Sequence, residues 1–192
     1  MKQRIGLFGG SFDPVHLGHL LVAQAAFEEI NLSRIFFIPT AQSPFKPESS
    51  PVEPKDRLRM LHSALAGQTW CEVDRQEIDR GGISYTIETA RSYRNSFPDA
   101  ELFYLIGADH VAQLPKWREA NALAELLQFI VVPRPGEPGV ELPSPFRGNF
   151  LRGFPLAVSS STIRARVNAR LSIDHLVKRE VAEIIRNNGL YL

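Results

Sequence analysis

The stretch RIGLFGGSFDPVHLGH, residues 4–19, decides how this chain folds. Its first five residues are a short, largely apolar run of the kind that forms a buried strand, and apolar residues recur at helical spacing from residue 17 onward. Two adjacent glycines, Gly9 and Gly10, stand between these segments, where the backbone can turn sharply and can approach a ligand closely. A strand that turns directly into a helix is the basic unit of an α/β fold.

The same unit recurs along the chain. Buried strands are predicted at residues 4–8, 35–38, 102–106 and 129–132, with weaker candidates at 71–74 and 156–158. Helices are predicted at residues 17–29, 55–66, 85–95, 120–127, 160–169 and 174–187. The alternation predicts a Rossmann-like, doubly wound parallel sheet with helices on both faces and a helical C-terminal tail. The length of 192 residues fits a single domain, 1–192, and two segments rich in proline, 40–54 and 133–153, are predicted to be long loops.

Composition narrows the function classes. The formal net charge is +1, so no broad electrostatic field favours nucleic acid or an anionic membrane as a partner. A single cysteine excludes an internal disulfide and a cysteine-rich metal site. No stretch approaches the length of a membrane span, and no targeting segment is visible. We therefore expect a cytoplasmic protein that binds no nucleic acid and no membrane; the pattern leaves a homo-oligomer open.

The turn after the first strand has the composition of an anion site. Exposed backbone N–H groups at a glycine turn, followed by a helix N-terminus, favour phosphate. His16 and His19 lie one helical turn apart and so project from one face, and Gly18 leaves that face open. Three other interpretations compete: a tight turn alone, histidines buried in the core or on the surface, and a metal pair completed by Asp13. The dinucleotide fingerprint G-x-G-x-x-G and the P-loop pattern are both absent from the sequence.

A second candidate anion site precedes the helix predicted at 160–169. The serines Ser159, Ser160 and Ser161 are typical of a helix N-cap, where free N–H groups are exposed. Arg164 follows within about one turn and places a fixed cation near the same helix end. The alternative is a simple serine cap with a solvent-facing arginine.

These two segments carry a resemblance to a known family. GGSFDPVHLGH, residues 9–19, resembles the signature of the nucleotidyltransferase superfamily, whose H-x-G-H element handles the triphosphate of a nucleotide. VSSSTIR, residues 158–164, resembles the second element of that superfamily, I-S-S-T-x-I-R, with Ser161 where threonine is usual. The hydroxyl is retained, so we expect the contact to be kept.

Four internal stretches are similar to those of bacterial nicotinate-nucleotide adenylyltransferases. They are FFIPTAQSPFK (36–46), GGISYTIET (81–89), LIGADHVAQLPKW (105–117) and VVPRPG (131–136). The tail from residue 171 is also similar, although His175 and Lys178 stand where tyrosine and proline are usual. The resemblance covers essentially the whole chain.

The resemblance implies adenylyl transfer from ATP to nicotinate mononucleotide, with Mg²⁺ held mainly by the ATP phosphates and no metal site of the protein's own. It implies a catalytic set of His16, His19, Lys46 and Arg164. It implies ATP contacts from Gly9, Gly10, Ser11, Phe12, His16, Gly18, His19, Gly107, Asp109, Arg134, Ser159, Ser160, Ser161, Ile163 and Arg164. It implies contacts to the pyridine nucleotide from Lys46, Ser84, Tyr85, Thr86, Leu114 and Trp117, with the pyridinium ring stacked on the indole, where a cation–π interaction would stabilise it.

Other activities stay open at this point. The acceptor could be nicotinamide mononucleotide or phosphopantetheine, although the elements at 84–86 and 114–117 speak against phosphopantetheine. A nucleotide-binding sensor without catalysis is disfavoured because both histidines, Lys46 and Arg164 are kept together. The sequence HLGH also resembles an element of some aminoacyl-tRNA synthetases, but a chain of charge +1 without a basic stripe argues against RNA binding.

Overall fold

A computed structural model describes residues 2–45, 51–133, 141–153 and 156–192 of the chain. The strands described there form one sheet in the order β3-β2-β1-β4-β5-β6, and every pair in it is parallel. Their bounds are β1 Arg4–Gly10, β2 Arg34–Pro39, β3 Cys71–Val73, β4 Glu101–Gly107, β5 Gln128–Val132 and β6 Gly148–Phe150. The strand order reverses between β1 and β4, and ligands of open α/β sheets bind at the carboxyl ends of the strands at such a point.

Helices cover both faces of this sheet. Their bounds are α1 Leu17–Glu29, α2 Pro54–Leu65, α3 Gln76–Arg80, α4 Thr86–Ser96, α5 Ala108–Val111, α6 Ala120–Leu126, α7 Ser160–Asn168 and α8 Arg179–Asn187, with a 3-10 turn η1 at Leu114–Lys116. Two separate cores result, one with α1, α2, α7 and α8 and the other with α4, α5 and α6. Neighbouring residues of β4 alternate between them, since Phe103 and Leu105 belong to the first and Leu102 and Ile106 to the second.

The predicted α/β class is confirmed, and the corrections concern short elements. Residues 156–158 form no strand, because Val158 packs against the first core instead of pairing. The strand at that sheet edge is β6, inside the segment predicted as a loop. The last helix begins at Arg179 rather than at residue 174, because Ser172 and Asp174 hydrogen-bond to each other in a turn before it.

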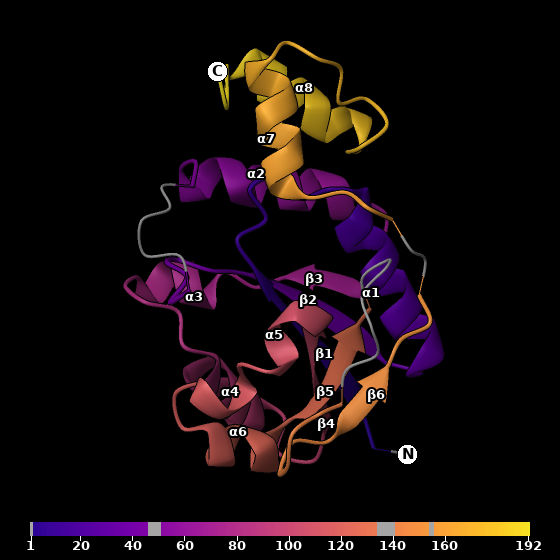
Figure 1. The fold of residues 1–192 in the computed structure, drawn as a ribbon, viewed down its shortest axis with the longest axis vertical. Helices are drawn as coiled ribbons and strands as arrows, with labels where there is room; N and C mark the ends of the chain where they lie inside the picture. Colours follow the sequence, from indigo (N-terminus) through magenta and orange to yellow (C-terminus); the bar gives the residue numbers. More distant parts are fainter. Residues whose placement is uncertain (1, 46–50, 134–140, 154–155) are drawn as a thin grey trace.

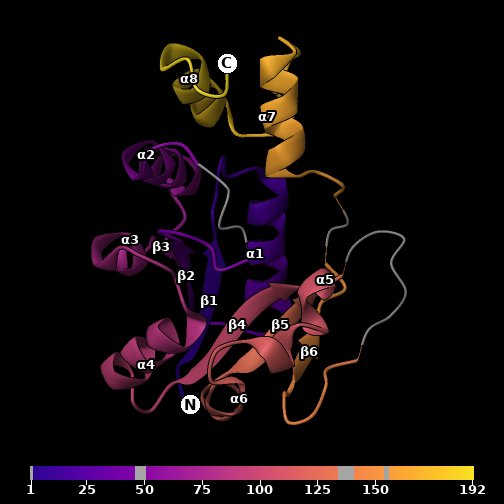
Figure 2. The ribbon, with the colours of Figure 1, turned by 60° about the vertical axis from the view of Figure 1, so that its left-hand side comes forward.

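The tail helices α7 and α8 extend beyond the sheet, as Figure 1 and the rotated view in Figure 2 show. α8 packs against α2, while α7 lies over the start of α1. The C-terminal part of the chain is thereby brought to the same end of the sheet as the turn after β1. Among the described residues, no helix combines the length and the apolar character that a bilayer crossing needs.

Candidate active site

The turn that joins β1 to α1 is shaped by close packing. A Cβ on Gly9 would collide with the hydroxyl of Tyr104 on the neighbouring strand. A Cβ on Gly10 would lie 3.1 Å from the ring of Phe12, which is itself buried and held at a φ of 46°. A left-handed φ is costly for an aromatic residue, so it persists only where the surroundings enforce it. Gly9 and Gly10, predicted to form the turn, are instead the last paired residues of β1, and packing rather than a left-handed φ is what requires glycine there.

The two histidines of this turn form a stacked pair. Their ring centroids are 3.7 Å apart and the ring planes are inclined by 24°. His16 is the N-cap residue of α1, and its backbone N–H donates to Nδ1 of His19 at 3.2 Å. Because Nδ1 of neutral His19 is an acceptor, its proton is carried by Nε2. Nε2 of His19 is therefore available as a hydrogen-bond donor to a ligand.

Burial keeps both imidazoles uncharged. It lowers the pKa of His16 to about 4. It also lowers the pKa of His19 well below the usual 6.5, and the neighbouring His16 adds to that effect. Edge contacts with Phe12 and Phe8 surround the His19 ring with apolar surface. Nδ1 of His16 is buried and has no hydrogen-bond partner in the part of the chain that the structure describes.

The second predicted element lies directly against this turn. Ser159 caps α7, with its Oγ accepting from the Thr162 N–H at 3.1 Å. Ser160 Oγ donates to the Pro14 carbonyl oxygen at 2.9 Å. Arg164 Nη1 donates to the Asp13 carbonyl oxygen at 2.8 Å. A Cβ on Gly18 would lie 2.9 Å from Val158 Cγ1 and 3.0 Å from His16 Nδ1, so this glycine makes the close approach of the two segments possible.

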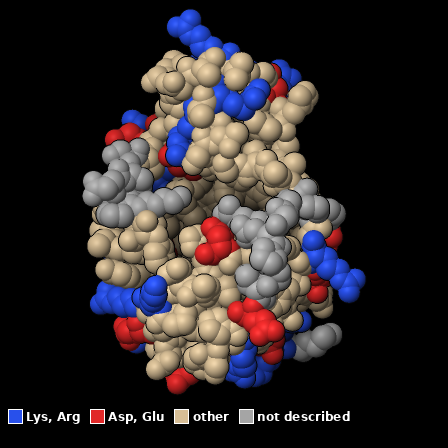
Figure 3. All heavy atoms as spheres, in the orientation of Figure 1, with Lys and Arg blue, Asp and Glu red and all other residues tan. Residues whose placement is uncertain are grey.

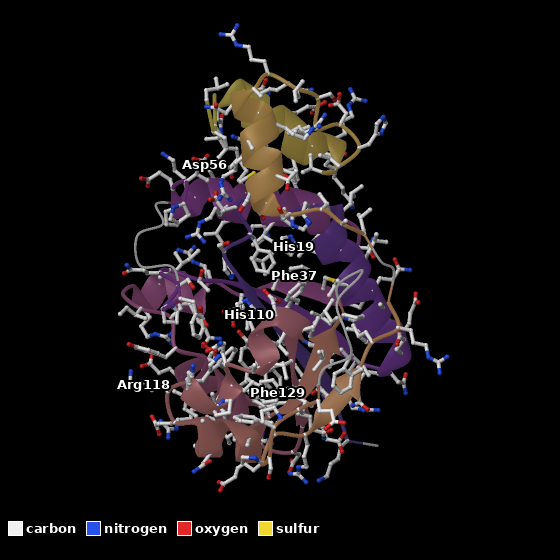
Figure 4. All side chains as sticks on the ribbon, in the orientation of Figure 1. His19, Phe37, Asp56, His110, Arg118 and Phe129 are labelled. Carbon is white, nitrogen blue, oxygen red and sulfur yellow. The ribbon has the colours of Figure 1, made fainter. Side chains whose placement is uncertain are left out.

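These contacts leave a hollow at the carboxyl end of the sheet. Figure 3 shows it on the face of the molecule where, in the same orientation, Figure 4 places His19 beneath α7 and near Phe37. An uncharged N–H donor, an arginine and the start of a nine-residue helix converge there. Such a set can bind a phosphate chain and stabilise charge that develops on it.

The residues predicted to bind the pyridine nucleotide lie at the start of α4. Ser84 is buried and joins two loops, since its Oγ accepts from the Ala41 N–H and its N–H donates to the Gln42 carbonyl, both at 2.9 Å. Tyr85 precedes the first helical residue, Thr86, and its ring faces the guanidinium of Arg118 at 4.5 Å. The segment 84–86 is thus fixed in place by its neighbours.

A carboxyl group is buried behind that segment. Glu77 is 5% exposed, and its Oε1 accepts from Thr89 Oγ1 at 2.5 Å. Burial raises the pKa of Glu77, while hydrogen bonds from Thr89 and Ser84 oppose the change. Its Oε2 has no hydrogen-bond partner among the described residues. Sequence reasoning missed Glu77, because a single acid in a short polar helix resembles a surface residue.

Trp117 lies in an aromatic cluster beyond the end of β4. Its ring meets Tyr104 edge-on with centroids 5.9 Å apart, and Phe45 lies 5.7 Å away at a tilt of 41°. Phe45 is half-exposed and comes from the loop after β2. A half-buried indole beside an exposed aromatic side chain can accept a flat ring in this cluster.

Gly107 and Asp109 follow β4, at the same edge of the sheet. Asp109 Oδ1 lies over Gly107, where it would collide with a Cβ. Its Oδ2 is 3.5 Å from His110 Nε2. Figure 4 shows His110 on α5, across the hollow from His19. The carboxylate is therefore near the hollow on the side opposite α7.

Four of the predicted residues require separate comment. Lys46 and Arg134 lie outside the described residues. Leu114 and Ile163 have no exposed surface and pack in the second and the first core respectively. The structure therefore makes Leu114 a packing residue behind Trp117 and not a side chain on the surface of the site, and Ile163 supports α7 from within.

Sequence reasoning also missed Arg57, which is 1% exposed. Its Nη1 donates to the carbonyl oxygens of Ser11 at 2.9 Å and Thr40 at 2.8 Å, and its Nε donates to the Val52 carbonyl oxygen at 3.3 Å. Burial lowers the pKa of Arg57, and the nearby Asp13 opposes that shift. An arginine in a helix of mixed polarity is typical of an exposed position, so no sequence signal distinguishes it.

The chain matches a known protein family over most of its length. The family described as "Cytidylyltransferase-like" matches residues 7–166. A protein of Opitutus terrae named "Probable nicotinate-nucleotide adenylyltransferase" is 44% identical over 192 residues, covering 98% of each chain. A protein of the same name from Thermus thermophilus is 41% identical over 189 residues, covering 98% of this chain and 100% of the relative.

Solved structures of similar fold are found at lower sequence identity. The nicotinic acid mononucleotide adenylyltransferase of Plasmodium falciparum, in complex with APC, superposes with a TM-score of 0.81 at 18% identity, covering 98% of this chain and 97% of the other. The same protein in complex with NaAD gives a TM-score of 0.80 at the same identity and coverage. At this identity the likeness establishes the fold.

Proposed function

We infer the activity from one premise: the chain belongs to the nicotinate-nucleotide adenylyltransferase family, within the proteins described as cytidylyltransferase-like. On this premise it transfers the adenylyl group of ATP to nicotinate mononucleotide, forming deamido-NAD and pyrophosphate as a step of NAD biosynthesis. The observation that carries the proposal is the meeting of the histidine turn after β1 with the serine-capped start of α7. The two signature elements lie 139 positions apart in the sequence, from His19 to Val158, and only the fold brings them together.

The chemistry requires positioning more than activation. A phosphate oxygen of nicotinate mononucleotide attacks the α-phosphorus of ATP, a new P–O bond forms, and the bond to the bridging oxygen of the β-phosphate breaks. The electron pair of that bond leaves with pyrophosphate. The nucleophile is already an anion, so no general base is needed, and the attack is direct, without a covalent enzyme intermediate. Catalysis then depends on holding two anions together and on stabilising the charge of the leaving group.

The residues of the hollow fit these tasks. His19 donates from Nε2 to the triphosphate, and His16 is assigned to the same group because its ring is stacked on that of His19 in the H-x-G-H element. Arg164 supplies permanent positive charge next to the α7 start. Lys46 and Arg134, which lie outside the described residues, are assigned the same phosphate-neutralising role on the family resemblance alone.

Mg²⁺ is proposed to enter with ATP. Within the described ranges, no group of three or more His, Cys, Asp or Glu side chains gathers as a metal site. Magnesium commonly binds through substrate phosphates and few protein groups. When bound, Mg²⁺ would neutralise negative charge on the phosphates. Asp109, which follows β4, is the carboxylate that we assign to this metal–phosphate region.

The acceptor would bind on the other side of the hollow. Trp117 offers an indole for the pyridinium ring, and the segment 84–86 offers backbone and hydroxyl groups for the carboxylate and ribose. Leu114 supports Trp117 from the core. The amide, nicotinamide mononucleotide, and phosphopantetheine remain the alternative acceptors.

Pyrophosphate release tests the proposal. The chain is incubated with ATP and Mg²⁺, and nicotinate mononucleotide, nicotinamide mononucleotide and phosphopantetheine are compared as acceptors, with a reaction lacking acceptor as the blank. Release with nicotinate mononucleotide well above the other acceptors is expected. Release only with another acceptor would reassign the substrate, and binding of ATP without any release would make the chain a nucleotide sensor.

A further inference from the structure

Asp13, in the turn before α1, is the common partner of three distant parts of the chain. It is 5% exposed. Its Oδ1 accepts from the hydroxyl of Tyr191 at 2.7 Å and from the backbone N–H of Val52 at 3.3 Å. Its Oδ2 is 3.7 Å from Arg164 Nη1. A buried carboxylate therefore links the histidine turn to α7, to the segment before α2 and to the residues beyond α8.

Tyr191 is held in place for this contact. Its backbone has a φ of 67°, a left-handed conformation that costs free energy for a tyrosine and needs compensating contacts. Its side chain packs against the first core. Burial raises the pKa of Tyr191, and the neighbouring Asp13 raises it further, so the hydroxyl stays protonated and remains a donor.

The hydrogen bonds of Asp13 determine how Arg164 is held. An arginine beside a free carboxylate forms a two-pronged ion pair, the strongest arrangement available to these groups. Here Oδ1 is already occupied by Tyr191 and Val52, so Arg164 meets the carboxylate only through Oδ2. Nη1 is anchored instead on the Asp13 carbonyl, and Nη2 lies 3.4 Å from Ser161 Oγ, at the start of α7.

We propose that Tyr191 is a positioning residue for ATP: by occupying Oδ1 of Asp13, its hydroxyl keeps Arg164 from closing a two-pronged ion pair and leaves the guanidinium directed toward the triphosphate. Tyr191 acts through Asp13 and Arg164 and touches no substrate. The expected effect on catalysis rests on the proposed function, because it assigns Arg164 to the triphosphate. The expected effect on Mg·ATP binding can be measured without the acceptor.

The test compares two tyrosines in matched settings. Tyr191→Phe removes only the hydroxyl that bonds to Asp13. Tyr93 lies on α4 in the second core, and its hydroxyl donates to Asp74 Oδ2 at 2.5 Å. Tyr93→Phe removes that hydroxyl. Burial raises the pKa of both tyrosines, so the two changes are chemically alike. Calorimetry measures Mg·ATP binding to each full-length protein, and steady-state kinetics separate the KM of ATP from the KM of the acceptor.

Tyr191→Phe is expected to weaken Mg·ATP binding about fivefold, the effect of one lost hydrogen bond, and to raise the KM of ATP while that of nicotinate mononucleotide stays unchanged. Tyr93→Phe is expected to change neither. In a double-mutant cycle, adding Tyr191→Phe to Arg164→Ala should weaken Mg·ATP binding no further, because Tyr191 acts through Arg164.

Three outcomes would overturn the inference. They are unchanged Mg·ATP binding in Tyr191→Phe, equal weakening in Tyr93→Phe, and an additive effect on top of Arg164→Ala. If Tyr191→Phe does not fold, Asp13→Asn supplies the readout: it removes the charge that would capture Arg164, so Mg·ATP binding should be no weaker than in the wild type, and a fivefold loss would contradict the inference. If the wild-type protein binds Mg·ATP but releases no pyrophosphate with any acceptor, the proposed function fails while the calorimetric comparison still decides the role of Tyr191.

Discussion

At the scale of single residues, the stacked histidines show how the fold prepares donors for an anion. Burial lowers the pKa of both rings, so they do not repel each other as cations before ATP arrives. The hydrogen bond from the His16 backbone fixes the tautomer of His19. A preorganised donor needs no rearrangement when charge develops on the phosphates.

His19→Ala should therefore reduce kcat by about 100-fold or more, the usual size of a lost donor to a developing oxyanion. The fold should be unaffected, as judged by circular dichroism and thermal unfolding. His175→Ala, at an exposed position of the tail, is the control and should retain full activity. Turnover near the wild-type level in His19→Ala would remove the histidine from the mechanism.

The two tryptophans of the chain allow a second comparison. Trp117→Ala should raise the KM of the pyridine nucleotide about tenfold and change the KM of ATP little, because a cation–π interaction of about 1 kcal/mol or more is lost with the ring. Trp70, stacked on Phe27 at 4.6 Å in the first core, gives the control. Trp70→Phe should affect thermal stability and neither KM. Equal effects of Trp117→Ala on both substrates would contradict the assigned ring site.

At the scale of elements, α2 holds the loops of the site through one buried arginine. Arg57 donates to carbonyl oxygens of the loops that follow β1 and β2 and of the segment before its own helix. The Ser11 and Thr40 carbonyls lie just beyond the ends of β1 and β2, and the guanidinium supplies them with hydrogen-bond donors. The helix thereby sets the distance between the two loops.

Arg57→Ala should destabilise the fold by about 3 kcal/mol, because several buried acceptors and the charge of Asp13 lose their partner. Urea unfolding measures the change. Arg57→Lys should recover little of it, since one ammonium group cannot reproduce a planar fork of donors. Arg59→Ala, exposed on the same helix, should stay within about 0.5 kcal/mol of the wild type. A loss in Arg57→Ala no larger than in Arg59→Ala would show that the arginine is dispensable.

The elements that could be predicted from sequence are those with a strong apolar pattern. β1, β2, β4 and β5 are buried runs, and each agrees with its predicted range to within two residues at either end. β6 could not be found, because all three of its residues are exposed and it is specified only by backbone pairing with β5. In the apolar segment 156–158, only Val158 packs, beside Gly18 and without a strand partner, whereas Leu156 and Ala157 are exposed.

The site could be predicted in part for a similar reason. His16, His19 and Arg164 stand in short motifs whose spacing already expresses their geometry, and the structure brings them together. Tyr191 donates to Asp13 across 178 residues of sequence and Arg57 donates to Ser11 across 46, and no local pattern records such contacts. Leu114 stands in a motif but is a core residue, because a motif does not separate side chains that touch a ligand from those that support them.

At the scale of the whole molecule, the lowered pKa values of His16 and His19 make the stability of the fold depend on pH. The folded-state pKa of His16 is about 4, against an ordinary value of 6.5, so the unfolded chain takes up a proton that the folded chain refuses. The free energy of unfolding is therefore not reduced by His16 above pH 6.5, where the imidazole is neutral in both states. It falls as the pH drops from 6.5 toward 4, because only the unfolded chain gains the proton. His19 acts in the same direction.

Urea unfolding at a series of pH values should therefore show a slope of up to about 1.4 kcal/mol per pH unit for each buried histidine in this window. The double variant His16→Gln, His19→Gln should have a shallower slope, and the difference between the two proteins isolates the histidines from other titrating groups. Parallel curves for the wild type and the double variant would contradict the burial of neutral imidazoles.

The central claim is that the turn after β1 and the start of α7 together form one triphosphate site. A crystal structure with Mg²⁺ and a non-hydrolysable ATP analogue tests it most directly. The account predicts His19 Nε2 and the Arg164 guanidinium within hydrogen-bond distance of the phosphates, with the adenosine extending toward the end of β4. Phosphates bound elsewhere, or contacted by only one of the two segments, would contradict it.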